Sequence, residues 1–244
     1  MPALPLQGKS ALVTGGARRI GREIVLALAK AGADVAFTYR NSKDKAASTL
    51  DELESLDVSA MATECDVRSE TSVRATVCAA VERFGKLDIL VNSAAIFDSA
   101  PLDSLTLEQW DAVFETNTRG PFLVAREAIR HLRSSHGRII NVGSLGGIRP
   151  WASHGHYCAS KAALHMLTQV MAKAFAPEVS VNCVAPGWIE MEQPSEAARR
   201  FADKTPIGRN GTADDVAQAV VFFATGPGFV TGQILAVDGG LGLA

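Results

Sequence analysis

Short apolar runs alternate with amphipathic segments along the whole 244-residue chain. Apolar runs of this length are typical of strands covered on both faces, and the segments between them have helical periodicity. The predicted strands are 10–13, 34–39, 59–65, 87–92, 137–142, 179–185 and 233–237. Helices are predicted between successive strands, including one opened by a capping box at Thr106 and running through Asn117, and one over 153–175. This alternation predicts one α/β domain over 1–244, a doubly wound parallel sheet of about seven strands with helices on both faces.

Composition removes several classes of function. A net charge of −2 gives no reason to expect a nucleic-acid partner or an anionic membrane surface. The N-terminal residues lack the basic start and apolar core of a secretion signal, and no apolar run approaches the ~18 residues of a membrane span. The four cysteines are scattered, and His154 and His156 have no further partners at metal-ligand spacing. We therefore expect a cytoplasmic protein with reduced thiols and no metal.

A glycine-rich turn joins the first predicted strand to the first helix. Thr14–Gly21 reads TGGARRIG, with Gly15 and Gly21 at either end of the turn. Such glycines also fit a plain tight turn, but before a helix the turn exposes backbone N–H groups that suit a diphosphate. In this alternating chain the turn predicts a Rossmann-type dinucleotide site.

The end of the second strand predicts which dinucleotide binds. An acidic residue there would bond a ribose 2′-hydroxyl, whereas a cation accommodates a 2′-phosphate. This strand ends in Tyr39, Arg40, Asn41 and Ser42 without a carboxylate, and Arg18 in the glycine turn adds a second cation. The arginines also fit solvated surface charges, but together with the missing acid they favour NADPH.

Other strand ends complete the predicted cofactor site. Asp66 is expected to contact the adenine and Ile189 to cover the carboxamide. Asn92, Ser93 and Ala94 are expected to line the cofactor floor. The remaining predicted cofactor contacts are Arg19, Ile20, Val67, Pro186 and Gly187.

Three residues predict the chemistry. Tyr157 and Lys161 lie four apart in a predicted helix and therefore share a face, where an ammonium would stabilise phenolate and lower the pKa of the tyrosine. Ser144 follows the fifth strand at the sheet edge that also carries the glycine turn. Its hydroxyl can hold a substrate carbonyl while Tyr157 delivers a proton.

With these motifs the whole chain resembles a short-chain dehydrogenase/reductase. The likeness rests on the glycine turn, the Asn92 segment, Asn117, Ser144, Tyr157-x-x-x-Lys161, Pro186-Gly187 and the terminal Asp238-Gly239-Gly240. The resemblance implies that Asn117 holds a water that relays protons to Lys161, and that Lys161 also binds the nicotinamide ribose. It further implies a homotetramer formed through the two long helices that carry Asn117 and Tyr157.

Two departures from the family pattern refine the expected substrate. Arg19 stands where glycine is usual, and Ser93-Ala94-Ala95 replaces the common Asn-Ala-Gly run. The arginine resembles that of pteridine and dihydromonapterin reductases, and Phe97 falls where those enzymes place a ring over the pterin. Ser144 departs from that branch, which often has aspartate there. The preferred hypothesis is an NADPH-dependent pteridine reductase.

Alternative functions remain open at this point. A 3-oxoacyl-(acyl-carrier-protein) reductase or another small carbonyl reductase is the second reading, and a non-catalytic dinucleotide sensor is the third. The expected substrate contacts are Arg19, Phe97, Ser144 and Trp188. The long stretch 188–211, rich in proline and glycine around a short helix, is predicted to be a lid over a small-molecule substrate.

Overall fold

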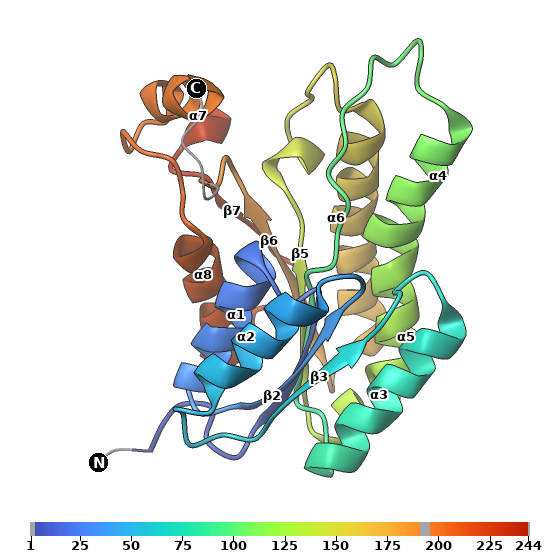
Figure 1. The fold of residues 1–244 in the computed structure, drawn as a ribbon, viewed down its shortest axis with the longest axis vertical. Helices are drawn as coiled ribbons and strands as arrows, with labels where there is room; N and C mark the ends of the chain where they lie inside the picture. The colour runs from blue at the N-terminus through green and yellow to red at the C-terminus, as the bar shows by residue number, and fades with distance from the viewer. Residues whose placement is uncertain (1–2, 191–195, 244) are drawn as a thin grey trace.

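Parallel strands form the centre of the computed structural model, which describes residues 3–190 and 196–243. The described residues contain a seven-stranded sheet in the order β3-β2-β1-β4-β5-β6-β7, and every adjacent pair is parallel (Figure 1). The strands are β1 Ser10–Thr14, β2 Asp34–Tyr39, β3 Ala60–Glu64, β4 Ile89–Asn92, β5 Arg138–Val142, β6 Ser180–Pro186 and β7 Ile234–Val237. The predicted fold class is therefore confirmed.

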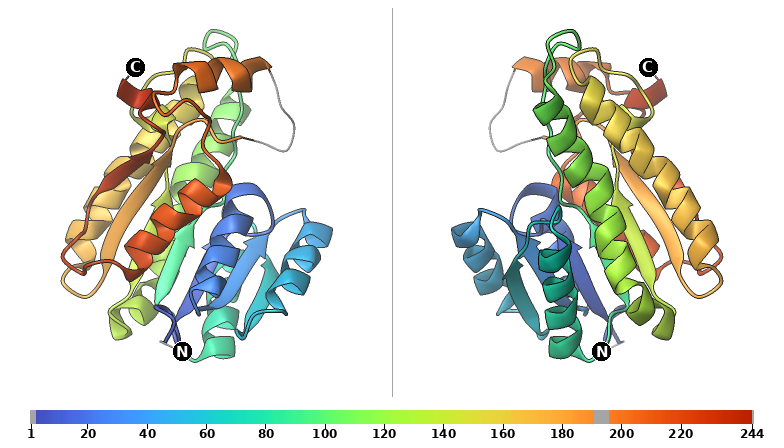
Figure 2. Two further views of the ribbon diagram at one scale, coloured as in Figure 1. Left: turned by 90° about the vertical axis from the view of Figure 1, so that its left-hand side faces the viewer. Right: turned by 90° about the vertical axis from the view of Figure 1, so that its right-hand side faces the viewer.

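Helices cover both faces of the sheet, as Figures 1 and 2 show. The longer helices are α1 Arg19–Lys30, α2 Lys43–Leu53, α3 Glu70–Phe84, α4 Leu107–Phe114, α5 Gly120–Ser134, α6 Gly155–Phe175, α7 Glu196–Lys204 and α8 Ala213–Thr225. Apolar side chains of α1 and α8 pack on one face, and those of α3, α5 and α6 pack on the other. The two cores enclose strands that are apolar on both sides, which is why a strict alternation of polar residues is missing from them.

The long helix predicted from Thr106 is present but changes its winding. A capping box formed by Thr106 and Gln109 opens α4, and a π-helical turn, η1 Glu115–Arg119, connects α4 to α5. Asn117 lies inside this turn. Single π turns within helices are frequent at functional sites because the extra residue redirects side chains and backbone groups.

Two details differ from the sequence prediction. The sixth strand continues through Pro186, which pairs with Val237 instead of breaking the strand. Pro186 lacks an N–H, and the hydrogen bond to the main-chain oxygen of Val237 is donated by Gly187 instead. The short helix predicted within 188–211 is described over Glu196–Lys204, two residues beyond its predicted end at Ala202, and its predicted start at Ser195 lies outside the described residues.

The carboxyl edge of the sheet gathers the predicted site. The strand order reverses between β1 and β4, which pair directly and whose connections lead to α1 and α5 on opposite faces of the sheet. Ligands of open parallel sheets bind outside the carboxyl ends at such a reversal. The loops after β1, β4, β5 and β6 therefore meet where the sequence placed cofactor and substrate.

Candidate active site

The glycine turn wraps tightly against the loop that follows β4. Gly15 has a φ of +68°, and a Cβ placed on it would lie 2.8 Å from the Ala94 Cα. Thr14 Oγ1 accepts hydrogen bonds from the N–H groups of Ser93 and Ala94, at 3.0 and 3.1 Å. The predicted diphosphate turn and the predicted cofactor floor are therefore one connected unit.

The start of α1 is open to an anion. Arg18 is the N-cap residue in extended conformation, makes no side-chain cap hydrogen bond, and no acidic residue lies in the first helical turn. The first N–H groups of a helix and its dipole attract negative charge when no side chain caps them. This end of α1 fits the diphosphate of a dinucleotide.

Arg19 has a backbone conformation that is unusual for its residue type. Its φ is +54°, and its side chain is exposed beside the turn. A left-handed conformation costs a non-glycine residue roughly 1–2 kcal/mol, and such strain clusters at functional sites. The chain therefore keeps an arginine in a position that glycine would occupy at lower cost.

The edge of the site beyond β2 and β3 is basic. Arg40 is exposed after β2, and its charge contributes to lowering the pKa of Asp66. The dominant cause is the Arg68 side chain, whose hydrogen bonds to the Asp66 carboxylate, the shortest at 2.6 Å, bring that pKa to about 2. Sequence reasoning missed Arg68, although it stands two residues after Asp66. That Asp66 contacts adenine stays a prediction, and its carboxylate is held by Arg68 in this structure.

The other expected cofactor residues lie around the same edge. Asn92 is buried and donates to the Asn141 side chain at 2.8 Å, while its own Oδ1 has no hydrogen-bond partner among the described residues. Ile189 forms an isolated bridge with Gly211. The remaining predicted contacts differ in exposure: Asn41 is exposed, and partial burial is found for Ile20, Tyr39 and Ser42. The loop after β3 carries Val67, and the end of β6 carries Pro186 and Gly187.

The catalytic candidates come together above β5. Ser144 follows this strand, and its side chain lies close enough to the Tyr157 hydroxyl to act on the pKa of that phenol. The Ser144 Oγ also accepts from the N–H of Gly146 at 3.0 Å, which fixes it at the start of the short 3-10 helix η2 Leu145–Gly147. Two residues thirteen positions apart thus present their hydroxyl groups side by side, as the sequence predicted.

The electrostatics of Tyr157 correct one expectation. Burial raises its pKa above the usual value, and the Ser144 side chain opposes that shift. The net lowering expected from Lys161 is therefore not found in this structure, because the desolvation of the phenol sets the direction of the shift. Tyr157 is consequently a neutral phenol, ready to donate its proton.

Lys161 is buried beneath the tyrosine. Its Nζ donates to the main-chain oxygen of Val142 at 2.8 Å and lies 5.8 Å from the centre of the Tyr157 ring. Burial lowers the pKa of the ammonium to about 8. A charged group at this depth is costly unless it is bonded, which Val142 ensures.

Asn117, in the π turn η1, forms hydrogen bonds with the residue before Lys161 and with the loop after β4. Its Oδ1 accepts from the Ile96 N–H at 2.8 Å, and its Nδ2 donates to the Ile96 carbonyl and to Ser160 Oγ. The side chain thus joins the loop after β4 to α6, next to Tyr157 and Lys161. A water held at Asn117 stays a prediction.

Aromatic rings form a wall beside the hydroxyl pair. We use "ring cluster" for Phe97, Trp151, His154 and Tyr157. Phe97 packs edge-on to Tyr157 with centroids 4.9 Å apart, yet it stays 59% exposed. The exposed face of this ring is available to a ligand. His154 was not predicted as part of the wall, because its approach depends on the path of the loop after β5.

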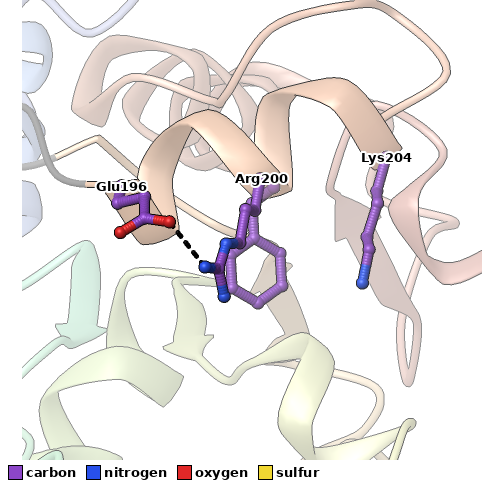
Figure 3. A pocket seen from close by; sticks show the side chains of 4 residues that line it. Glu196, Arg200 and Lys204 are labelled. Atoms are coloured by element: carbon purple, nitrogen blue, oxygen red, sulfur yellow. Dashed lines mark hydrogen bonds and ion pairs between the residues drawn. The ribbon is translucent and has the colours of Figure 1, made fainter.

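A hollow of about 460 Å³ lies against α7 and is lined by Glu196, Arg200, Phe201 and Lys204. Figure 3 shows Glu196, Arg200 and Lys204 pointing from the same side of the helix. Glu196 pairs with Arg200, whereas no ion pair involves Lys204 within the described residues. Phe201 stacks on Trp188 with centroids 4.1 Å apart, which joins α7 to the segment just after β6. Residues 191–195 of the predicted lid lie outside the described residues.

The described residues contain neither a membrane-spanning helix nor a metal-binding cluster. No helix among them has the length and apolar character needed to cross a membrane. Within the same ranges, no three His, Cys, Asp or Glu side chains are grouped so that they could hold a metal ion.

The comparisons with known proteins agree with one another. A family model described as enoyl-(acyl carrier protein) reductase matches residues 15–242. The 3-oxoacyl-(acyl-carrier-protein) reductase FabG of Staphylococcus aureus strain Mu50 is 36% identical over 240 residues, covering 96% of this chain and 98% of the relative.

Solved structures are similar over nearly the whole chain. A dehydrogenase/reductase from Sinorhizobium meliloti 1021 has a TM-score of 0.94 at 39% identity, covering 98% of this chain and 97% of the other. A short chain dehydrogenase from Burkholderia cenocepacia J2315, solved in complex with NADP, has a TM-score of 0.91 at 41% identity, with 97% and 99% coverage. Together with the fold and the Ser144–Tyr157–Lys161 arrangement, these matches show that the chain belongs to the short-chain dehydrogenase/reductase family of oxidoreductases.

Proposed function

We propose that this protein is an NADPH-dependent reductase that converts a C=O or C=N group of a small molecule. The observation that carries the proposal is the buried pair of Ser144 and Tyr157 side chains, with the Nζ of the buried Lys161 5.8 Å from the centre of the Tyr157 ring. A non-catalytic sensor would need no proton donor, so this pair counts against that alternative. Turnover is tested by following NADPH oxidation with a panel of pterins, acetoacetyl thioesters and simple ketones.

NADPH fits the residues present. The uncapped start of α1 would hold the diphosphate, and the exposed Arg18 and Arg40 would pair with the 2′-phosphate. The Burkholderia relative solved with NADP supports the same choice. When bound, NADPH supplies the hydride.

Side chains of the protein itself provide the proton that the reduction needs. Ser144 donates a hydrogen bond that orients the substrate oxygen or nitrogen, and Tyr157 passes its phenol proton to that atom. Lys161 stabilises the phenolate left behind, because an ammonium near the phenol lowers the cost of the negative charge. Asn117 holds α6 against the loop after β4, so the donor stays in place. General acid catalysis of this kind contributes roughly 10²–10⁴ in rate.

Two substrate classes remain, each favoured by a specific observation. A pteridine is favoured by the half-exposed face of Phe97 and by the exposed, strained Arg19. A 3-oxoacyl thioester is favoured by Arg200 and Lys204 in the α7 hollow, which suit a phosphate-bearing carrier, and by the FabG relative. The same NADPH assay decides between them through the ratio of kcat/KM values for dihydropterins and acetoacetyl-CoA.

The segment 188–211 acts as a lid in this proposal. Trp188 contacts Phe201 of α7, so movement of the helix carries the wall of the site with it. Hydrogen exchange of peptides from this segment is expected to slow when NADPH and an inhibitor bind. Equal hydrogen-exchange rates with and without ligands would contradict the proposal that this segment is a lid.

A homotetramer completes the proposal, together with a cytoplasmic location. Phe122 of α5 and Met166 and Val170 of α6 are exposed apolar residues, 43%, 59% and 53% accessible in the single chain. Burial of such residues is what stabilises subunit contacts. Light scattering during size-exclusion chromatography tests the assembly, and a monomer at micromolar concentration would contradict it.

A further inference from the structure

His165 is a buried imidazole that the proposed proton chemistry does not use. It lies on α6 four residues beyond Lys161, which lies four beyond Tyr157. Residues at this spacing share one face of a helix. His165 is only 8% exposed, and its ring faces the loop after β5 that carries Ser144.

The loop closes around this ring. The Ser144 N–H donates to His165 Nε2 at 3.4 Å. A Cβ placed on Gly143 would lie 2.3 Å from that nitrogen, and one placed on Gly147 would lie 2.6 Å from the ring carbon Cε1. Glycines before and after Ser144 therefore leave the space that the imidazole fills.

We infer that His165 is a positioning residue, whose neutral imidazole accepts the Ser144 N–H and thereby holds the Ser144 hydroxyl beside Tyr157. The inference rests on the proposed function, in which Ser144 orients the substrate. The hydroxyl is fixed from two sides, since Ser144 Oγ accepts from Gly146 while its N–H is directed to His165. A loop held only at its ends would leave this rotamer free to turn.

The surroundings keep the imidazole neutral. Burial, and then the charge of Lys161, lower the pKa of His165 to about 4, against a smaller opposing effect of the Gly147 backbone. Cys183 of β6 lies against the same glycine, Gly143, and burial raises the pKa of its thiol to about 12, so it adds no charge. With Nε2 accepting, the ring proton belongs on Nδ1.

Protonation would undo this arrangement. An imidazolium has no acceptor for the Ser144 N–H, and it places a second buried cation beside Lys161. Activity should therefore fall as the pH drops towards about 4. If the imidazole ring served only to fill space, its protonation would not produce this fall in activity at acidic pH, which we call the acid limb of the pH–rate profile.

Substitutions separate the two roles. Glutamine can place its side-chain oxygen near the position of Nε2 without titrating in this range, whereas the shorter asparagine ends near Nδ1 and leucine has no acceptor. We would measure kcat and KM for NADPH and acetoacetyl-CoA in His165→Gln, His165→Asn and His165→Leu. Gln169→Ala, exposed on α6, is the matched control.

The expected result is a split between kcat and KM. His165→Leu and His165→Asn should lower kcat at least about tenfold with KM for NADPH within about twofold, and His165→Gln should recover most of kcat and lose the acid limb. Wild-type kcat in either the leucine or the asparagine variant would overturn the inference. So would a glutamine variant as slow as the other two. If the leucine variant does not fold, the asparagine variant carries the comparison.

A measurement without turnover separates this inference from the proposed function. Hydrogen exchange of peptides covering 143–147 should be faster in the leucine and asparagine variants than in wild type or His165→Gln. If the wild-type protein reduces none of the substrates tested, the proposed function fails, while the exchange comparison still decides whether His165 holds the Ser144 loop. Equal exchange in all variants would overturn the positioning role.

Discussion

The Nζ of Lys161 donates a 2.8 Å hydrogen bond to the main-chain oxygen of Val142, the last residue of β5. This bond ties the buried ammonium to the strand that leads into Ser144. The position of the charge is therefore set by the sheet, and Tyr157 is free to change its protonation without losing its neighbour.

Replacing the proton donor should separate chemistry from binding. Tyr157→Phe is expected to lower kcat by about 10²–10⁴, the range for loss of a general acid, with little change in the Kd for NADPH. Lys161→Ala should weaken both, because the ammonium supports the phenolate and, by family resemblance, the ribose. Fluorescence titration and steady-state kinetics measure the two effects. A Tyr157→Phe enzyme with near wild-type kcat would reject the mechanism.

The reaction should slow in alkaline solution as Lys161 loses its proton. Its pKa of about 8 predicts a kcat/KM that is level just below this pH and falls about tenfold per unit above it. In the unfolded chain this lysine has its ordinary pKa of 10.5 and holds its proton longer, so its contribution to the free energy of unfolding rises with pH between about 8 and 10.5. A pH–rate profile on the wild-type enzyme checks the first effect. A flat profile to pH 10 would show that the charge of Lys161 is not needed.

Cofactor preference should reside in the basic edge beyond β2. Arg40→Ala is expected to lower kcat/KM for NADPH about tenfold or more while leaving NADH nearly unchanged, because only NADPH carries the 2′-phosphate. Lys45→Ala is the matched control, since Lys45 is exposed on α2. Steady-state kinetics with both cofactors measure the ratio. An unchanged ratio in Arg40→Ala would exclude Arg40 from phosphate recognition.

The ring cluster should decide whether a pteridine binds. Methotrexate is expected to inhibit competitively at micromolar concentration, and Phe97→Ala should weaken it at least about tenfold, because the stacking face is lost. Leu102→Ala, another exposed apolar residue of the same loop, should have no such effect. Inhibition constants for the three proteins provide the check. Absence of inhibition, together with efficient reduction of acetoacetyl thioesters, would favour the 3-oxoacyl assignment.

The α7 hollow should favour anionic substrates. Lys204→Ala is expected to raise the KM for acetoacetyl-CoA several-fold and to leave that for the uncharged ethyl acetoacetate unchanged, because only the thioester carries phosphates. Arg199→Ala provides the control, as Arg199 is exposed on α7 but does not line the hollow. An equal rise in KM for both substrates would mean that the substitution disturbs α7 and that Lys204 does not bind the phosphates.

The sequence by itself determined the parallel α/β fold, the glycine turn, and the convergence of Ser144, Tyr157 and Lys161. These follow from local rules: strand and helix periodicity, the chirality of crossovers, and the four-residue spacing that places two side chains on one helix face. The loops after parallel strands meet at one edge whatever the details of packing, so strand-end residues could be assigned to one site.

Only the tertiary structure decided the charge states and the partners. The raised pKa of Tyr157 comes from desolvation, and the lowered pKa of Lys161 comes from a depth of burial that spacing does not reveal. The bond of Asp66 to Arg68 and the contact of His165 with the Ser144 N–H depend on side-chain directions and on a loop that closes around a ring. Burial and loop closure are sums over residues distant in the chain, and for that physical reason a local sequence pattern cannot contain them.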